Sequence, residues 1–306
     1  MKAAVHTQYG PPEVLKVIEV AKPTPKPNEI LVKIEAATVT SGDIRLRGSD
    51  FPPLFWLPAR LIFGLFRPKK QILGHEFSGT IEAIGDEVTR FKLGDTVLGT
   101  TTMLPEGSHA EYVCLPETWK HGVVLPKPRP LSFKEAAALP VGSMTALFLL
   151  EKADIKDGME VLIYGASGSV GSYALQIAKV KGAAVTAVSS GSNVDLLRSW
   201  GADATIDYKK EDYSTGSKTY DIVFDAVGKT TKSKAKKVLV QKGRFVSIKM
   251  ITSEKLEHLQ EAVEMVVAKK IKPFIEKEFA LDDIVQAHHH VESGRKRGNV
   301  VIAIGA

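Results

Sequence analysis

The segment Gly165-Ala-Ser-Gly-Ser-Val-Gly171 has the residue types and the spacing of a phosphate-binding turn. An apolar run at 161–164 precedes it and predicts a strand, and a helical pattern follows it. A strand that turns through glycines into a helix places backbone N–H groups and the positive helix end against a phosphate. Gly165 would make the tight turn, Gly168 would let the backbone approach a pyrophosphate, and Gly171 would let the helix pack on the sheet. The segment therefore predicts a dinucleotide site, with a Gly/Ser-rich turn as the structural alternative.

The single cysteine and a run of three histidines bear on whether the chain binds a metal. The single cysteine, Cys114, excludes an intramolecular disulfide and a cysteine-rich zinc site, and it fits a reducing compartment. The consecutive histidines 288–290 cannot converge on one ion, because neighbouring residues on a helix point about 100° apart. The pattern places His288 on the inner face of its helix as a hydrogen-bonded interior histidine. The residues that share this face are Ile284, Ala287 and Val291. We expect His289 and His290 to be exposed.

Length, composition and charge limit the class of protein. At 306 residues the chain is near the limit of a single core, so two domains are expected. Its 44% hydrophobic and 25% charged residues are typical of a soluble globular protein. The net charge of +6 would suit an anionic ligand or a nucleic acid. However, the most basic stretch is typical of one solvated helix face, formed by Lys232, Lys234, Lys236 and Lys237. We therefore expect no nucleic acid partner.

The most apolar stretch, 51–66, contains three prolines and Arg60, which make it unsuitable as a membrane-spanning helix. We expect it to form a pocket wall or a lid, with contact to a membrane surface as the alternative. The N-terminal residues lack the long apolar region of a signal peptide. Together with the single cysteine, these features predict a cytoplasmic protein with no membrane span.

The elements that must position these residues fall into two groups. Up to about residue 120, short β-like runs alternate with Gly and Pro, which predicts a compact, barrel-like β domain. Ser132 then caps a helix, with Glu135 at the reciprocal position, and the alternation of strands and helices predicts a parallel doubly wound sheet. Its five strands are expected at 161–164, 184–189, 204–207, 221–225 and 243–248. The last expected elements are a helix at 254–269, a strand at 272–276, a helix from Leu281 and a strand at 299–303.

Further motifs accompany the glycine loop. They are Gly74-His-Glu-Phe-Ser-Gly79 with Gly85, the segment 91–97, the segment 135–140 with Thr145-Ala146, and Phe224-Asp-Ala-Val-Gly228. In this order they resemble the medium-chain dehydrogenase/reductase superfamily and, within it, the zinc-independent, zeta-crystallin-like quinone oxidoreductases. The resemblance covers nearly the whole chain.

The resemblance implies an α/β fold with a Rossmann-type doubly wound parallel sheet and a GroES-like, mainly β, barrel-like catalytic domain. Together with the pattern, it gives the boundaries 1–121 for the GroES-like catalytic domain and 122–265 for the Rossmann nucleotide-binding domain. Residues 266–306 would form a C-terminal segment that returns to the catalytic domain.

The ligand positions of the zinc-dependent relatives test whether this chain binds zinc. A catalytic zinc needs three protein ligands. The zinc alcohol dehydrogenases have a cysteine where this chain has Thr40 and a later ligand in the region 140–143, and this chain has neither. The lobe with four cysteines that holds a structural zinc is also missing. The resemblance thus implies that the chain binds no metal. It also implies that His75 is a packed or hydrogen-bonded residue.

The segment 188–193, after the second strand of the Rossmann sheet, bears on the choice of nucleotide. An acidic residue there accepts hydrogen bonds from the adenosine ribose and disfavours a 2′-phosphate. No carboxylate occurs in this segment, which favours NADPH over NADH. The resemblance implies that Ser189 or Ser190 matches a small residue beside the phosphate, that Asn193 replaces a lysine, and that Tyr208 matches a tyrosine.

Other contacts with the cofactor follow from the same resemblance. Thr145 and the loop 247–249 would lie near the nicotinamide, Val227 and Gly228 near the ribose, and Asn299 near the cofactor from the closing strand. As structural alternatives, Gly228 could cap a strand and Thr145 could pack within its helix. The complete set of expected cofactor-binding residues is Thr145, Gly165, Ser167, Gly168, Ser169, Val170, Gly171, Ser189, Ser190, Asn193, Tyr208, Val227, Gly228, Ser247, Ile248, Lys249 and Asn299.

Without a metal to polarise a carbonyl, the resemblance favours NADPH-dependent reduction of a quinone or α,β-unsaturated carbonyl by hydride transfer. Charge then develops on a distant oxygen, which hydrogen-bond donors or water can stabilise. Thr40 and Arg45 align with the family segment that lines the substrate side of the nicotinamide. The family typically has asparagine at the position of Thr40, and some members have tyrosine at the position of Arg45. Thr40 keeps a hydroxyl donor, and Arg45 could stabilise charge. Asp43 and Arg47 are expected as an ion pair or as loop anchors.

Two other functions remain open from the sequence. One is a zinc-free, NADP-dependent alcohol or aldehyde reductase. The other is a non-catalytic NADPH- or RNA-binding, crystallin-like protein, motivated by the replaced lysine, by Thr40 and by the basic charge. The expected partner is a small hydrophobic carbonyl or quinone substrate. Many relatives have a further strand after the position of Ser247 that extends the sheet across a dimer. This chain is short at that position, so both a monomer and a homodimer remain possible oligomeric states.

Overall fold

The computed structural model describes residues 1–305, apart from the side chain of Leu54, and its contacts divide the chain into two units. Unit 1 is Met1–Pro140 together with the chain from Ile275 onward, and unit 2 is Val141–Phe274. These boundaries lie later in the chain than the expected 121/122 and 265/266. The first differs because helix α3 (Phe133–Ala137) packs on strands β3 (Glu29–Thr38) and β4 (Glu76–Ile84), so it belongs to unit 1.

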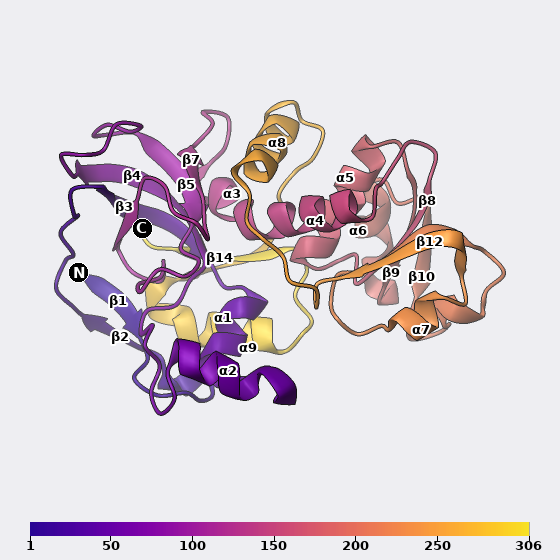
Figure 1. Cartoon of the computed structure of the whole chain (residues 1–306), viewed down its shortest axis with the longest axis horizontal. Coiled ribbons are helices and arrows are strands. Elements are labelled where there is room, and N and C mark those ends of the chain that lie inside the picture. The colour runs from indigo at the N-terminus through magenta and orange to yellow at the C-terminus, as the bar shows by residue number, and fades with distance from the viewer. Residues whose placement is uncertain (306) are drawn as a thin grey trace. The chain divides into compact units, whose positions relative to one another are not determined.

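The main sheet of unit 1 consists mostly of antiparallel pairs (Figure 1). Its strand order is β13-β14-β3-β4-β5-β7, and β6 also pairs with β3. Apolar side chains of β3 and β4, among them Ile30, Val32 and Phe77, are buried in its core. The remaining strands are β5 (Thr96–Thr100), β6 (Tyr112–Pro116), β7 (Val124–Pro126), β13 (Ile275–Ala280) and β14 (Asn299–Ala303). A separate antiparallel pair joins β1 (Lys2–Val5) and β2 (Lys16–Glu19). The expectation of a mainly β, GroES-like domain is confirmed.

The C-terminal strand β14 returns to unit 1, as expected, and pairs antiparallel with β3. Strand β13 begins at Ile275, later than the expected residue 272, since Pro273 has no N–H to donate to a sheet. Between them lie a 3₁₀ turn, Leu281–Asp283, and helix α9 (Ile284–Glu292).

Helix α9 lies beside helix α1 (Ser41–Gly48) in unit 1 (Figure 1). Its inner face is buried, and His288 lies on that face, as expected. His289 is exposed, also as expected. The expectation that His290 is exposed is wrong, because its ring packs near Phe279 and its Nε2 pairs with Glu276 at 2.9 Å. Helix α2 (Pro53–Phe63) completes the helices that the described part of unit 1 contributes, together with the short 3₁₀ turn Pro12–Val14.

Unit 2 contains a five-stranded parallel sheet in the order β10-β9-β8-β11-β12 (Figure 1). Its strands are β8 (Glu160–Tyr164), β9 (Ala184–Ser189), β10 (Ala204–Asp207), β11 (Tyr220–Asp225) and β12 (Leu239–Ser247). Its helices are α4 (Pro140–Lys152), α5 (Ser169–Val180), α6 (Val194–Ser199), α7 (Lys232–Ala235) and α8 (Leu256–Val267). The apolar run Val161–Ile163 is fully buried, as in a strand covered on both faces. The expectation of a Rossmann-type parallel sheet is confirmed. No helix within residues 1–305 is long and apolar enough to cross a bilayer.

Candidate functional site

The glycine loop of unit 2 connects β8 to α5, and each of its three glycines meets a different constraint. Gly165 has φ +81°, and a Cβ there would lie 2.4 Å from Cγ1 of Val227. A Cβ on Gly171 would lie 2.2 Å from the carbonyl oxygen of Gly165, so only glycine lets α5 approach the loop. A Cβ on Gly168 would instead enter open space, 3.6 Å from that carbonyl oxygen. This open space at Gly168, in front of the start of α5, fits the pyrophosphate of a dinucleotide.

A serine and asparagine network holds the segment beside this loop. The Oγ of Ser189 donates to Oγ of Ser167 at 2.8 Å, and Nδ2 of Asn193 donates to Oγ of Ser189 at 2.9 Å and of Ser190 at 3.1 Å. Asn193 is buried, and its amide holds the two serines in place. The lysine that it replaces in the family would extend outward instead. Tyr208 is 51% exposed, and its N–H donates to the carbonyl of Ser189 at 3.1 Å. The fold thus brings Ser167, Ser189, Ser190, Asn193 and Tyr208 together.

The same segment has an acidic neighbour that its own sequence does not show. Asp207, at the end of β10, lies opposite Ser189 of β9. Its Oδ2 lies 2.5 Å from where a Cβ of Gly191 would be, and its Oδ1 accepts a hydrogen bond from the N–H of Lys209 at 3.0 Å. A carboxylate therefore lies against the segment 188–193 after all, contributed by the next strand.

A buried carboxylate, that of Asp225, ties the two loops that were expected near the nicotinamide and its ribose. Asp225, at the end of β11, accepts the N–H groups of Val227 and Lys229, each at 3.3 Å, through Oδ1. Its Oδ2 accepts the hydroxyl of Ser247 at 3.0 Å, and Oγ of Ser247 accepts the N–H of Lys249 at 3.3 Å. Asp225 therefore positions both the 227–229 and the 247–249 loop. We missed this role from the sequence, although the residue lies within a quoted motif.

Two further residues of the expected cofactor set lie elsewhere. Thr145 is partly buried within α4 of unit 2. Asn299 is buried at the start of β14 in unit 1. Their contacts with a cofactor stay predictions.

The polar centre of unit 1 is Asp43, a fully buried carboxylate in the first turn of α1. Its Oδ1 accepts the N–H of Gly74 at 2.8 Å and Nδ1–H of His75 at 2.7 Å. Its Oδ2 accepts the N–H of Thr40 at 2.8 Å and the hydroxyl of Thr40 at 2.6 Å. Burial opposes ionisation of this group, but the positive charge and hydrogen bond of His75 and the hydrogen bond of Thr40 hold the pKa of Asp43 well below its usual value.

These contacts leave His75, but not Thr40, with a polar atom that is available for proton exchange. The hydroxyl of Thr40 caps α1 and donates to Asp43, so it is already engaged. His75 is hydrogen-bonded, as expected, but its side chain is 20% exposed. Because Nδ1 donates to Asp43, the second ring nitrogen, Nε2, is the atom that can exchange a proton; no partner within the described residues occupies it.

Arg47 anchors α1 to α9, while Arg45 is exposed in the last turn of α1. The buried guanidinium of Arg47 donates to Oε1 of Glu292 at 2.8 Å and to Nδ1 of His288 at 3.1 Å. Its ion-pair partner is therefore Glu292 and not Asp43. His288 was expected to be fully hydrogen-bonded, but its Nε2 is buried without a partner in the described chain.

The donor set of unit 1 is unlike that of a metal centre. Within residues 1–305 no group of three His, Cys, Asp or Glu side chains could hold a metal ion. Asp43 and His75 bind each other, and Thr40 supplies a neutral hydroxyl that is engaged in the helix cap.

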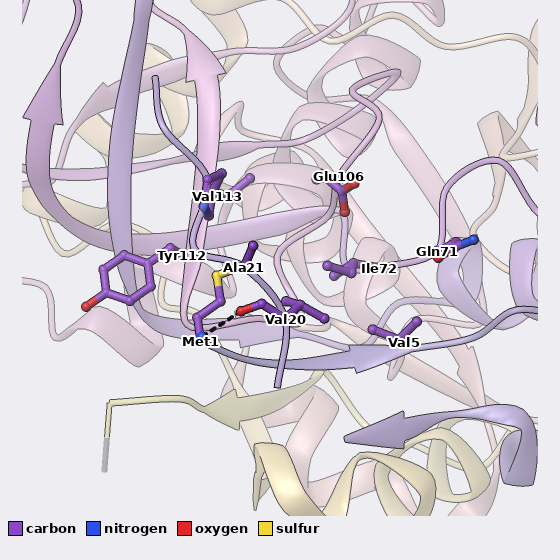
Figure 2. Close-up of a pocket in the computed structure, with 10 residues that line it drawn as sticks. Met1, Val5, Val20, Ala21, Gln71, Ile72, Glu106, Tyr112 and Val113 are labelled. Carbon is purple, nitrogen blue, oxygen red and sulfur yellow. Dashed lines mark hydrogen bonds between the residues drawn. The ribbon is translucent and has the colours of Figure 1, made fainter. Parts of the chain in front are cut away.

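One hollow of about 290 Å³ lies in unit 1 away from these residues (Figure 2). Val5, Val20 and Ile72 line it with apolar side chains, and Gln71 and Glu106 add polar groups (Figure 2). Unit 2 has another hollow of about 510 Å³ beside α8, where His258 pairs with Glu151 at 2.8 Å. Neither hollow contains an expected site residue.

Comparisons with known proteins find relatives whose family agrees with the folds of the two units. Residues 26–128 match the alcohol dehydrogenase GroES-like domain, and residues 200–302 match the zinc-binding dehydrogenase family. The 2-methylene-furan-3-one reductase of Solanum lycopersicum is 35% identical over 322 residues, which cover 99% of this chain and 79% of that protein. The chloroplastic NADPH-dependent alkenal/one oxidoreductase of Arabidopsis thaliana is 29% identical, with the same coverage. The solved quinone oxidoreductase from Coxiella burnetii is 29% identical, covers 99% of both chains and has a TM-score of 0.85. The chain therefore belongs to the medium-chain dehydrogenase/reductase superfamily, in its quinone oxidoreductase branch.

Proposed function

We propose that the protein is an NADPH-dependent oxidoreductase that reduces a quinone or an α,β-unsaturated carbonyl without zinc. The observation that carries this proposal is the open glycine cradle between β8 and α5 in a chain of this family. The relatives named for enone, alkenal and quinone reduction support the substrate class. Thr40 and the Asp43–His75 pair, in place of a three-ligand set, support the zinc-free assignment.

In this proposal unit 2 holds the cofactor. The glycine loop and the first amides of α5 receive the pyrophosphate, and Ser189, Ser190 and Tyr208 surround the 2′-phosphate. Asp225 keeps the 227–229 and 247–249 loops in place for the nicotinamide end. When bound, NADPH supplies a hydride to the substrate. The expected residues Thr145, Ser247, Ile248, Lys249 and Asn299 are part of the same proposal.

Unit 1 supplies the proton in this proposal. A quinone or enone that accepts hydride gains negative charge on oxygen, and a positioned donor lowers the barrier by stabilising that charge. Thr40 and Arg45 are the candidates that the sequence names. Because the hydroxyl of Thr40 already donates to Asp43, we add His75 as the group that delivers the proton through Nε2. Asp43 is then a positioning residue, which fixes the ring and its tautomer. Arg45, which is exposed, would stabilise charge electrostatically.

Cellular location and assembly are finer proposals. We place the protein in the cytoplasm, on the support of its single cysteine, as a monomer or homodimer that acts on a small hydrophobic substrate and binds no nucleic acid. The alternatives, a zinc-free alcohol or aldehyde reductase and a non-catalytic NADPH- or RNA-binding protein, are separated from it by the experiment below.

The experiment is to follow NADPH oxidation by the purified protein with 9,10-phenanthrenequinone, an enone, and a saturated ketone. Turnover of the quinone or enone but not of the ketone is expected. Gly168→Val should abolish NADPH binding, because its side chain fills the open space of the cradle, whereas Gly216→Ala, at an unconstrained turn, should not. Binding of NADPH without any turnover would contradict the enzymatic proposal, and preferred turnover of the ketone would favour the alcohol or aldehyde reductase. Stoichiometric zinc in the active protein would overturn the zinc-free assignment.

A further inference from the structure

Helix α2 presents an apolar face to its surroundings. Because successive residues on a helix are about 100° apart, one arc of α2 holds Phe55, Leu57, Pro58, Leu61 and Ile62, which we call the apolar helix face. All five are exposed. In the described chain the large apolar side chains exposed between residues 55 and 66 are Phe55 at 60%, Trp56 at 43%, Leu57 at 53%, Leu61 at 58%, Ile62 at 55%, Leu65 at 38% and Phe66 at 86%. An apolar patch of this continuity marks an interaction site and not the scattered exposure of an ordinary surface.

The opposite side of α2 is attached to the rest of unit 1. The guanidinium of Arg60 lies 3.9 Å from the ring centre of Tyr9, and the Tyr9 hydroxyl donates to the carbonyls of Phe63 and Gly64 at 3.0 and 2.8 Å. The rings of Phe51 and Phe63 stack at 5.9 Å. Ala59 is buried on this side. The helix is therefore held with its apolar face outward.

The charged side chains within the segment that carries this face have one sign. Between Phe51 and His75 the charged residues are Arg60, Arg67, Lys69 and Lys70, and the segment contains no carboxylate. Arg67 and Lys69 are exposed directly after the apolar residues. A second copy of this face would bring these cations together without an acidic partner from the segment, whereas an anionic surface would complement them.

From this combination we propose that the apolar helix face, with Leu65, Phe66, Arg67 and Lys69, docks on the surface of an anionic lipid bilayer. The apolar side chains enter the boundary between headgroups and acyl chains, Trp56 lies at the interface, and the two cations meet anionic headgroups. The proposal is independent of the reductase function, since it involves neither the glycine cradle nor Asp43 and His75.

The experiment is sedimentation of the full chain with vesicles of phosphatidylcholine alone or of phosphatidylcholine with phosphatidylglycerol. We expect binding to the anionic vesicles, a blue shift of the fluorescence that Trp56→Phe removes, and weaker binding at high salt. The double variant Leu61→Ser/Ile62→Ser should bind about a hundredfold more weakly, because two buried apolar side chains are lost. The double variant Arg67→Glu/Lys69→Glu should bind anionic vesicles at least about tenfold more weakly, since each cation near an anionic surface contributes to the binding free energy. The control Leu93→Ser changes an exposed leucine of unit 1 outside the segment and should bind as the wild type does.

Circular dichroism and urea unfolding establish that each variant is folded. The proposal is overturned if the folded wild type does not bind anionic vesicles, or if the two double variants bind as well as Leu93→Ser does. It is also overturned if size-exclusion chromatography shows that the wild type is a dimer which both double variants dissociate, because a second copy then covers the face. Loss of reductase activity in any assay has no bearing on these outcomes.

Discussion

The hydrogen bond between Asp43 and His75 is the contact of unit 1 from which most chemistry follows. A buried carboxylate that accepts four donors is fixed in position, and it fixes the ring that donates to it. The ring then presents Nε2 from a partly exposed side chain. Such a pair can release and recover a proton without moving the backbone.

We expect His75→Gln to lower kcat for an enone by about a hundredfold, the lower end of the roughly 10²–10⁴ contributed by a positioned acid. The Kd of NADPH should not change, because the cofactor cradle lies in unit 2. Steady-state kinetics and a fluorescence titration with NADPH check the two parts. His289→Gln, at an exposed histidine paired with Glu13, is the matched control. An unchanged kcat in His75→Gln, with a large loss in Thr40→Val, would assign proton delivery to the threonine hydroxyl instead.

In the proposed site, we expect the choice between NADPH and NADH to depend on Asp207 as well as on the segment 188–193. Its carboxylate lies against Gly191. In the proposed site it would oppose the charge of a 2′-phosphate. We expect Asp207→Asn to tighten NADPH binding by about fivefold, on the basis of roughly 1 kcal/mol between unit charges 4 Å apart in water. NADH binding should stay the same. The amide keeps an oxygen for the N–H of Lys209, so the turn is retained.

Titration of both nucleotides against Asp207→Asn and the exposed control Glu211→Gln checks this prediction. A loss of NADH affinity in Asp207→Asn would mean that the carboxylate binds the ribose hydroxyls and favours NADH.

Cys114 is a further residue whose surroundings decide its chemistry. It lies half-buried in β6, and burial, with a contribution from Glu29, raises the pKa of its thiol to about 11. Since the thiolate is the reactive form, alkylation by iodoacetamide at pH 8 should be about a hundredfold slower than for an exposed cysteine with a pKa near 8.5. The rate should rise with pH up to about 11. Mass spectrometry of the alkylated chain across this pH range measures it, and a plateau near pH 9 would contradict the effect of burial.

Among the elements, helix α3 shows how a short local motif sets a boundary between the units. Ser132 and Glu135 form a reciprocal cap in which Oγ of Ser132 accepts the N–H of Glu135 at 3.2 Å. The cap directs the helix onto β3 and β4, and Ala137 and Ala138 are buried with Ala36 and Val301. Without the cap, the first N–H groups of this five-residue helix lose a partner.

We expect Ser132→Ala to reduce the free energy of unfolding of the chain by about 1 kcal/mol, the usual cost of losing an N-cap. Glu135→Gln, which can still accept from the backbone N–H of Ser132, should change it by only a few tenths of a kcal/mol. Urea unfolding of both variants provides the measurement. A loss in Glu135→Gln as large as the loss in Ser132→Ala would show that the charge of Glu135 stabilises α3 as much as the serine cap does.

Local signals predicted the elements whose pattern is complete within a short stretch. The buried strands of unit 2 are apolar runs, the cap at Ser132 is a four-residue motif, and the glycine loop lies between a strand and a helix. The contacts of Asp207 with residue 191, of Asp225 with residue 247 and of Asp43 with residue 75 join separate segments. Short-range patterns cannot show such pairs, because the fold alone brings them together.

Helix α2 is a related case. Pro52, Pro53 and Pro58 argued against a spanning helix, and the structure places Pro53 in the first turn and accommodates Pro58 on the exposed side. The segment forms a helix of eleven residues whose composition is apolar on its outer side. The expected role of the segment 51–66 as a pocket wall or lid depended on its hydrophobicity alone. Hydrophobicity does not distinguish a segment that lines a pocket from one whose apolar side chains are exposed.

For the molecule as a whole, the main consequence is that unit 1 is discontinuous in sequence. Its sheet includes β14, which pairs with β3, and its core includes Val300 and Ile302 packed with Leu15, Val39 and Leu73. Residues 1–140 therefore cannot complete their core until the last thirty or so residues have been made. Unit 2, by contrast, is one continuous segment with its own parallel sheet.

This arrangement predicts opposite effects of two truncations. A chain that ends at Phe274 lacks β13, β14 and α9, so one side of β3 and the apolar cluster around Leu15 are left uncovered, and we expect it to bind a hydrophobic dye and to aggregate. Its unit 2 keeps all five strands, so the far-ultraviolet signal of a parallel α/β domain should persist in the soluble fraction. Removal of residues 305 and 306 alone should leave solubility and unfolding unchanged, because β14 ends at Ala303. If the chain ending at Phe274 stayed soluble and unfolded in a single transition at the wild-type urea concentration, the returning strand would not be needed to complete unit 1.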